Sequence, residues 1–201
     1  SGTAFAAAQY LKKVVINWKL LLPMMALAML ASFAGSILLT QMHNDFMKPV
    51  LLVVLSLVAI YTFVKKDFGQ HKEKAHSPTT HIFYSLLISL VIGFYDGFIG
   101  PGAGSFLVMA FVVMMGYDFL HASANAKMVN LATNFGSILL FVIKGKILWA
   151  VAIPMALCNA AGGFTGAKLA INKGNKFIRI FFLIIVVGTL MRFAYDVFFK
   201  M

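Results

Sequence analysis

Long apolar runs, separated by short polar stretches, dominate the pattern of this chain. Runs such as 50–64 and 177–190 contain at most one charged residue each. A helix that crosses the roughly 30 Å hydrocarbon core of a bilayer needs about 20 mostly apolar residues. Because several such runs follow one another, the pattern predicts an all-α membrane protein, a polytopic helical bundle, rather than the buried core of a soluble domain.

The polar breaks between the runs place the expected helices. These lie at about 1–13, 18–40, 47–64, 81–116, 121–143, 147–171 and 176–198. Residues 65–80 form the only long polar stretch and contain four lysines, a glycine and a proline. We interpret them as a linker, cytoplasmic because it is rich in lysine, between two halves, 1–64 and 81–201.

The segment 81–116 is apolar but unsuited to one regular helix. Five glycines and a proline fall within 93–105, and both residue types weaken or break helices. At 1.5 Å per residue a straight helix of this length would span about 54 Å, well beyond the bilayer core. The segment is therefore expected to form a broken helix pair, with helices at about 81–97 and 103–116.

An internal repeat links the two halves. Residues match at one offset of 131 in the pairs Trp18/Trp149, Pro23/Pro154, Met24/Met155, Gly35/Gly166 and Leu38/Leu169. The first three segments thus repeat as the last three, whereas 81–116 lacks a counterpart ahead of Ser1, so we interpret the chain as a fragment with its first segment missing. Parallel and inverted halves both fit the loop charges, and the excess length of 81–116 favours inverted halves.

Composition supports the membrane interpretation. Hydrophobic residues make up 61% of the 201 residues and charged residues 11%, against about 45–50% and 25% in soluble domains. The net charge of +11 comes from basic residues between apolar runs, which is typical of loops beside anionic headgroups. The expected partner is therefore the lipid bilayer and not nucleic acid.

The break itself is a candidate anion site. Broken helices inside a bilayer survive where they line a wet cavity, and many transporters build substrate sites from them. A helix beginning here presents backbone N–H groups and the positive end of its dipole to an anion. The candidate residues are Gly100, Gly102, Ala103, Gly104 and Ser105, of which the last four are expected to offer free N–H groups. The alternative is tight helix packing through small residues.

Polar residues within apolar segments add to this candidate. Lys127, Asn130 and Asn134 recur at i, i+3 and i+7, so they share one helix face and are expected to bind an oxyanion. The alternative is that Lys127 snorkels to the interface while the amides join helices. Asp96 is the one carboxylate well inside an apolar segment, and it is expected either to carry a coupling proton or to hold the break by accepting backbone hydrogen bonds.

No sequence motif indicates catalysis, a cofactor or a metal. The glycine-rich stretch lacks the Lys-Ser/Thr of a phosphate loop, and no nucleophile–base pair is evident. The spacing of His71, His76 and His81 fits no zinc motif, and the single Cys158 has no disulfide partner. We therefore expect no enzyme activity, no cofactor and no metal.

At this point the chain resembles the TauE/SafE family, the sulfite exporter and sulfonate permease group of bacterial membrane proteins. The resemblance rests on 93–97 with 100–105, 126–134, 145–149, 162–167 and 178–179. It implies a carrier of two similar halves in the bacterial plasma (inner) membrane that moves sulfite, sulfonates or related small organic anions. The motifs specify the family rather than the substrate.

The function expected from these features is secondary transport of a small anion. No ATP-binding motif is present, so an ion gradient would supply the energy. Two alternatives stay open: an anion channel, which would share a basic, glycine-lined site, and a structural membrane protein that transports nothing.

Overall fold

The computed structural model describes residues 1–41, 78–100 and 102–199, and for parts of 174–199 it describes the backbone alone. The described helices are α1 Gly2–Leu11, α2 Trp18–Leu39, α4 Pro78–Phe98, α5 Ala103–Met115, α6 Phe119–Ile143 and α7 Trp149–Phe199. Within these ranges there is no strand, and the predicted all-α fold is confirmed. The expected segment 47–64 and most of the linker 65–80 lie outside the described residues.

Four of the described helices are long and apolar enough to cross a membrane. They are α2, residues Thr79–Phe98 of α4, α6, and residues Trp149–Lys173 of α7. Large apolar side chains such as Leu30, Ile143 and Leu157 point outward and are mostly exposed, as lipid-facing side chains must be. The chain is therefore a multi-pass membrane protein, as predicted. At 13 residues, α5 reaches only about 20 Å.

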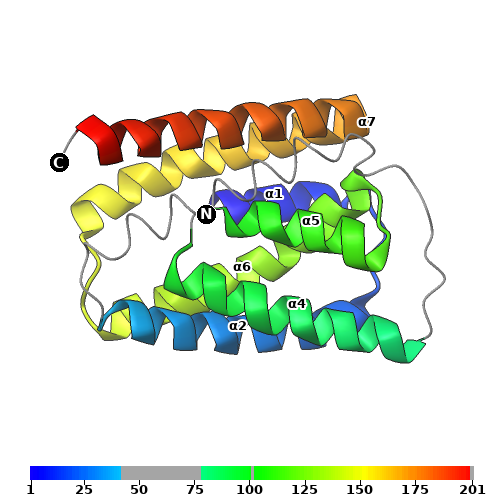
Figure 1. Ribbon diagram of the computed structural model, residues 1–201, viewed down its shortest axis with the longest axis horizontal. Helices are drawn as coiled ribbons and strands as arrows, with labels where there is room; N and C mark the ends of the chain where they lie inside the picture. The colour runs from blue at the N-terminus through cyan, green and yellow to red at the C-terminus, as the bar shows by residue number, and fades with distance from the viewer. Residues whose placement is uncertain (42–77, 101, 200–201) are drawn as a thin grey trace.

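The helices pack around α6, which contacts α1, α2, α4, α5 and α7. In Figure 1, α2 and α4 lie on one side of the molecule and α7 on the other, with α1, α5 and α6 between them. One core cluster joins α2, α4, α5 and α6 through residues that include Leu21, Met24, Ile88 and Phe111. A second, built largely of alanine, joins α1, α6 and α7. Small side chains there leave room for the site described below.

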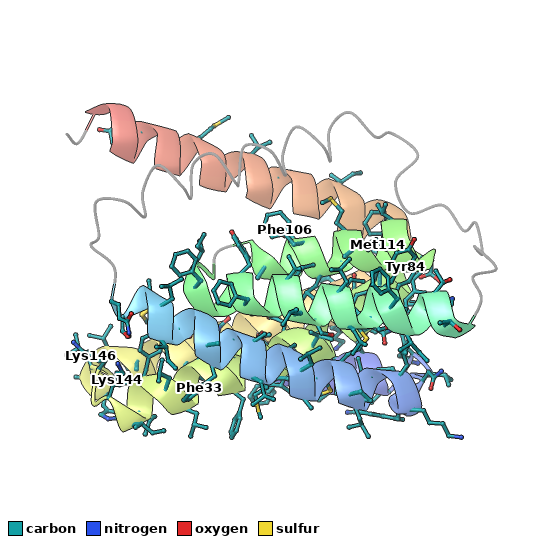
Figure 2. The ribbon with its side chains drawn as sticks, turned by 60° about the horizontal axis from the view of Figure 1, so that its bottom comes forward. Phe33, Tyr84, Phe106, Met114, Lys144 and Lys146 are labelled. Carbon is teal, nitrogen blue, oxygen red and sulfur yellow. The ribbon has the colours of Figure 1, made fainter. Side chains whose placement is uncertain are left out.

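Helices α2 and α6 run in the same direction. Ser32 of α2 meets Thr133 of α6, and near the ends of the two helices Lys144 Nζ donates to Thr40 Oγ1 at 3.3 Å. Lys144 and Lys146 lie together at one end of the molecule, where α6 passes into α7 (Figure 2). Exposed lysines at a helix end are what the headgroup layer of a membrane favours.

The start of α6 is defined by its cap. Gly116 ends α5 in the left-handed region with φ 73°, and Asp118 then caps α6 by accepting from the backbone N–H groups of Leu120 at 2.8 Å and His121 at 2.9 Å. Partial burial opposes ionisation of Asp118, but hydrogen bonds from the backbone and ring of His121 outweigh it and hold the pKa of the carboxyl below its usual range.

The sequence expectation of two helices at 147–171 and 176–198 is wrong in one respect. Helical structure continues without interruption from Trp149 to Phe199, although the ribbon turns back within α7, so that its yellow start and red end lie on the same side of the molecule (Figure 1). The stretch 172–175 holds a glycine but no proline. A glycine costs a helix only about 1 kcal/mol, which does not force its hydrogen bonding to end.

Candidate functional site

The predicted break between α4 and α5 is confirmed. Helix α4 ends at Phe98 and α5 begins at Ala103, where the sequence placed it. Gly100 and Gly102 have φ angles of 86° and 88°, in the left-handed region that side chains disfavour. The glycines therefore allow the chain to reverse between two helices.

The start of α5 offers fewer free amides than the sequence suggested. The N–H of Ala103 donates to Gly100 O at 3.1 Å, and that of Ser105 donates to Gly102 O at 2.8 Å. The expectation that these two groups are free is wrong, because the tight turn and first turn of the helix use them. For the N–H groups of Gly102 and Gly104 no hydrogen bond to a described residue is found.

A cavity of about 390 Å³ lies at this helix start. Its walls come from α1, α5, α6 and α7. They comprise Gly2, Thr3, Ala6, Tyr10, Gly102, Gly104, Ser105, Val108, Ser123, Lys127, Asn159, Gly162, Gly163, Gly166, Ala167 and Ala170. Four of the predicted site residues thus meet in one space: three from the start of α5, and Lys127 from the middle of α6.

Lys127 is the cationic side chain of this cavity. It is half-buried, lies eight residues into α6, and no hydrogen bond or ion pair of its ammonium is found among the described residues. A charge taken out of water without a partner is costly. The position favours a ligand of opposite charge in the cavity.

Asn130 and Asn134 do not line the cavity, and neither do Gly100 or Ala103. Asn130 Nδ2 donates to Asp96 Oδ2 at 2.8 Å, and Thr133 Oγ1 donates to the same oxygen. Asn134 Nδ2 donates to Asn130 O at 2.7 Å.

This network touches the cavity wall at one residue. Asn134 Nδ2 donates to Thr3 Oγ1 at 3.2 Å, and Thr3 belongs to the wall. The two amides therefore form a layer behind the cavity, and Asn130 of this layer holds Asp96. Asp96 was expected either to carry a proton or to hold the break by accepting backbone hydrogen bonds. The hydrogen bonds found for it come instead from side chains of α6.

Sequence reasoning missed the wall contributed by α1 and α7. Tyr10 of α1 and Asn159 of α7 add polar groups, as does Ser123 of α6, and Gly162, Gly163 and Gly166 of α7 provide a surface without side chains. The three glycines recur at i, i+1 and i+4, which places them on one helix face. That spacing was the available signal, but it does not by itself separate a cavity wall from helix packing.

A second cavity is apolar. A hollow of about 430 Å³ between α4 and α5 is lined by apolar and aromatic side chains, including Phe106 and Met114 (Figure 2). Among the described residues, no cluster of His, Cys, Asp and Glu could hold a metal ion. His71 and His76 lie outside them.

Comparison with known proteins gives consistent matches over nearly the whole chain. The profile of one family, described as Sulfite exporter TauE/SafE, matches residues 1–193. The "Probable membrane transporter protein ORF9" of Sinorhizobium sp. is 32% identical over 97% of this chain and 74% of its own length. "Probable membrane transporter protein YfcA" of Escherichia coli K12 is 28% identical over 97% of this chain and 72% of its own. No solved structure matches significantly.

Proposed function

The chain belongs to the sulfite exporter TauE/SafE family of membrane transporters, and on that basis we propose that it is a secondary transporter of a small oxyanion such as sulfite or a sulfonate. One observation carries the proposal: the Lys127 ammonium and the start of α5 share a cavity within the helix bundle. The relatives come from bacteria, and a multi-pass protein of this kind resides in the inner membrane.

The chemistry of the cavity suits an anion. A helix start carries a partial positive charge and unpaired N–H groups, and an ammonium adds a full charge. Glycines on α5 and α7 let a ligand approach the backbone closely. A volume of about 390 Å³ holds a small anion with a few waters. In this proposal Lys127, Gly102, Gly104 and Ser105 contact the substrate.

Asn130 and Asn134 act one layer further out. Asn130 and Thr133 tie the carboxyl of Asp96 on α4 to α6, and Asn134 is bonded to Asn130. A carboxylate this near an anion site repels the substrate, whereas a protonated one does not. We assign to Asp96 the coupling proton: proton uptake at Asp96 would accompany anion binding, and the energy of the proton gradient would drive the anion.

The two halves are proposed to be inverted repeats. Helices α2 and α6 run in the same direction, whereas the first part of α7, the repeat partner of α2, runs the opposite way (Figure 1). Repeat partners of opposite direction are the arrangement by which many transporters alternate access to a central site.

A counterflow experiment tests transport and separates its rivals. The natural full-length protein is reconstituted in vesicles loaded with unlabelled sulfite, sulfonate or a short carboxylate, and uptake of the labelled anion is followed. A carrier accelerates uptake through exchange. An anion channel conducts without that acceleration, and a structural protein gives no flux above that of empty vesicles; either result would reject the proposal.

A further inference from the structure

Three serine hydroxyls meet where α2, α4 and α6 cross, outside the cavity. Ser32 Oγ lies 2.9 Å from Thr133 O and 2.8 Å from Ser137 Oγ. Ser36 Oγ lies 2.9 Å from Gly97 O and 3.0 Å from Ser137 Oγ. Ser32 and Ser36 are completely buried. Five oxygens, from three hydroxyls and two backbone carbonyls, thus lie together inside the bundle; we call them the oxygen cluster.

The oxygen cluster has fewer hydrogens than oxygen–oxygen contacts. It contains four oxygen–oxygen contacts, but each hydroxyl carries one hydrogen and a carbonyl carries none. Three hydrogens cannot bridge four contacts. At any moment one pair of oxygens lies about 3 Å apart with lone pairs facing each other. A cation placed among the oxygens removes that repulsion, because every lone pair then faces a positive charge.

The carbonyl of Gly97 makes the site more favourable for a cation. In a continuing helix this oxygen would accept from the N–H of residue 101, which is Pro101 and has no N–H. It accepts instead from Ser36. The last carbonyls of a helix form the negative end of its dipole, and Gly97 lies one residue before the end of α4. The break therefore turns a helix end toward the oxygen cluster.

We propose that the oxygen cluster binds a sodium ion. This inference rests on the proposed transport function and adds a coupling ion to it. Backbone carbonyls and the C-terminal ends of broken helices are ligands that transporters use for Na⁺, and the serine hydroxyls add further neutral oxygens. No carboxylate belongs to the cluster, as a calcium site would require. The oxygen–oxygen distances of 2.8–3.0 Å between the serines need to widen less to admit Na⁺ than to admit the larger K⁺. The cluster therefore favours Na⁺ over K⁺.

The cluster is joined to the anion site through two residues. Gly97 directly follows Asp96. Thr133 offers its carbonyl to the cluster and its hydroxyl to Asp96. A cation at the carbonyl of Thr133 therefore lies next to the layer that holds Asp96, and the two sites share α4 and α6. Occupation of one can in this way change the position of groups around the other.

Thermal stability in the absence of any oxyanion substrate tests binding. The melting temperature of the purified full-length protein is measured as NaCl replaces choline chloride at constant chloride concentration, with KCl as a parallel series. We expect NaCl to raise it and KCl to leave it unchanged. Ser36→Ala and Ser137→Ala should each weaken the apparent affinity for Na⁺ roughly tenfold or more, the effect of removing one oxygen that contacts a charge.

Ser89→Ala is the matched control. Ser89 is as buried as Ser36, but its hydroxyl donates to Ser85 O at 2.7 Å within α4. This variant should keep the full response to NaCl. An equal response to KCl and NaCl, no response to either, or an undiminished Na⁺ affinity in Ser36→Ala and Ser137→Ala would overturn the proposal. Because no oxyanion is present, this outcome is independent of the counterflow result.

Discussion

Replacement of Lys127 by methionine removes the charge and retains a long apolar side chain. The ammonium shares the cavity with the start of α5, and no partner is found for it among the described residues. Lys127→Met should therefore fold and insert at least as well as the natural protein, because it relieves an unpaired charge. Its defect should appear only when an anion is added.

The size of the defect follows from the bond that is lost. A hydrogen bond to a charged group contributes about 1.5–3 kcal/mol, and each 1.4 kcal/mol changes affinity tenfold. Substrate affinity should fall about 10- to 150-fold. The backbone N–H groups at the start of α5 stay in place, so weak binding should remain.

The assay is anion-dependent thermal stabilisation, followed by uptake in vesicles. Lys146→Met is the control, because Lys146 is exposed and lies at the end of the molecule beside Lys144 (Figure 2). It removes the same charge and should leave affinity unchanged. Normal affinity in Lys127→Met, or an equal loss in both variants, would refute the anion site and favour the snorkelling interpretation.

Three further predictions follow from the same geometry. Asp96→Asn should keep anion binding and abolish the dependence of uptake on a proton gradient, measured at two external pH values; retained dependence would contradict the role of Asp96. Gly163→Ala should destabilise the protein by about 1–3 kcal/mol, because its new Cβ would overlap the carbonyl of Gly2. Gly166→Ala is the control, because a Cβ there meets nothing within 4 Å and should not destabilise the protein. Equal melting temperatures of the two variants would argue against this packing. Asp118→Ala should lose about 1 kcal/mol of stability. Because the pKa of Asp118 is lowered in the folded protein, this contribution is fully present above the usual carboxyl pKa of about 4. It is lost as the pH falls through the lower pKa of the folded state. The melting temperature of the variant should therefore lack this part of the dependence on acid pH.

The features predictable from the sequence were those imposed by the backbone. Pro101 and its neighbouring glycines cannot continue a helix, so the break and the start of α5 at Ala103 followed directly. The lengths of α2 and α6 followed from their apolar runs. The uninterrupted helical assignment of α7 was not expected, although its ribbon turns back between two stretches, as the two predicted helices would (Figure 1).

Side-chain partners were less predictable. The spacing of Lys127, Asn130 and Asn134 placed them on one face, but a helix face is wide enough to contact two neighbours. Lys127 reaches the cavity, whereas both amides turn to the layer around Asp96. The periodicity of a single helix carries no information on where the next helix lies. The serines of the oxygen cluster escaped notice for the same reason, since the i, i+4 spacing of Ser32 and Ser36 on α2 does not show that Ser137 of α6 lies opposite them.

One pattern of contacts bears on the predicted repeat. At the offset of 131, Ser32 corresponds to Gly163, and Thr133 corresponds to Gly2. Ser32 donates to the carbonyl of Thr133, and Gly163 approaches the carbonyl of Gly2 so closely that a Cβ would overlap it. Exchange of the two halves therefore converts one observed contact into the other, as a two-fold relation between the halves requires.

The same correspondence connects the two proposed sites. Four of the five cluster residues have counterparts at this offset, which are Gly163 for Ser32, Ala167 for Ser36, Gly2 for Thr133 and Ala6 for Ser137, and all four counterparts line the cavity. Where the first crossing has hydroxyls, the second has hydrogen atoms or methyl groups. Hydroxyls fill their crossing and bring oxygen atoms together, which suits a cation. The small apolar residues of the second crossing form part of the cavity wall, where the charge of Lys127 and the start of α5 favour an anion in the proposed transport site. Two sites of opposite preference can thus arise from one repeated helix crossing by the exchange of a few small side chains.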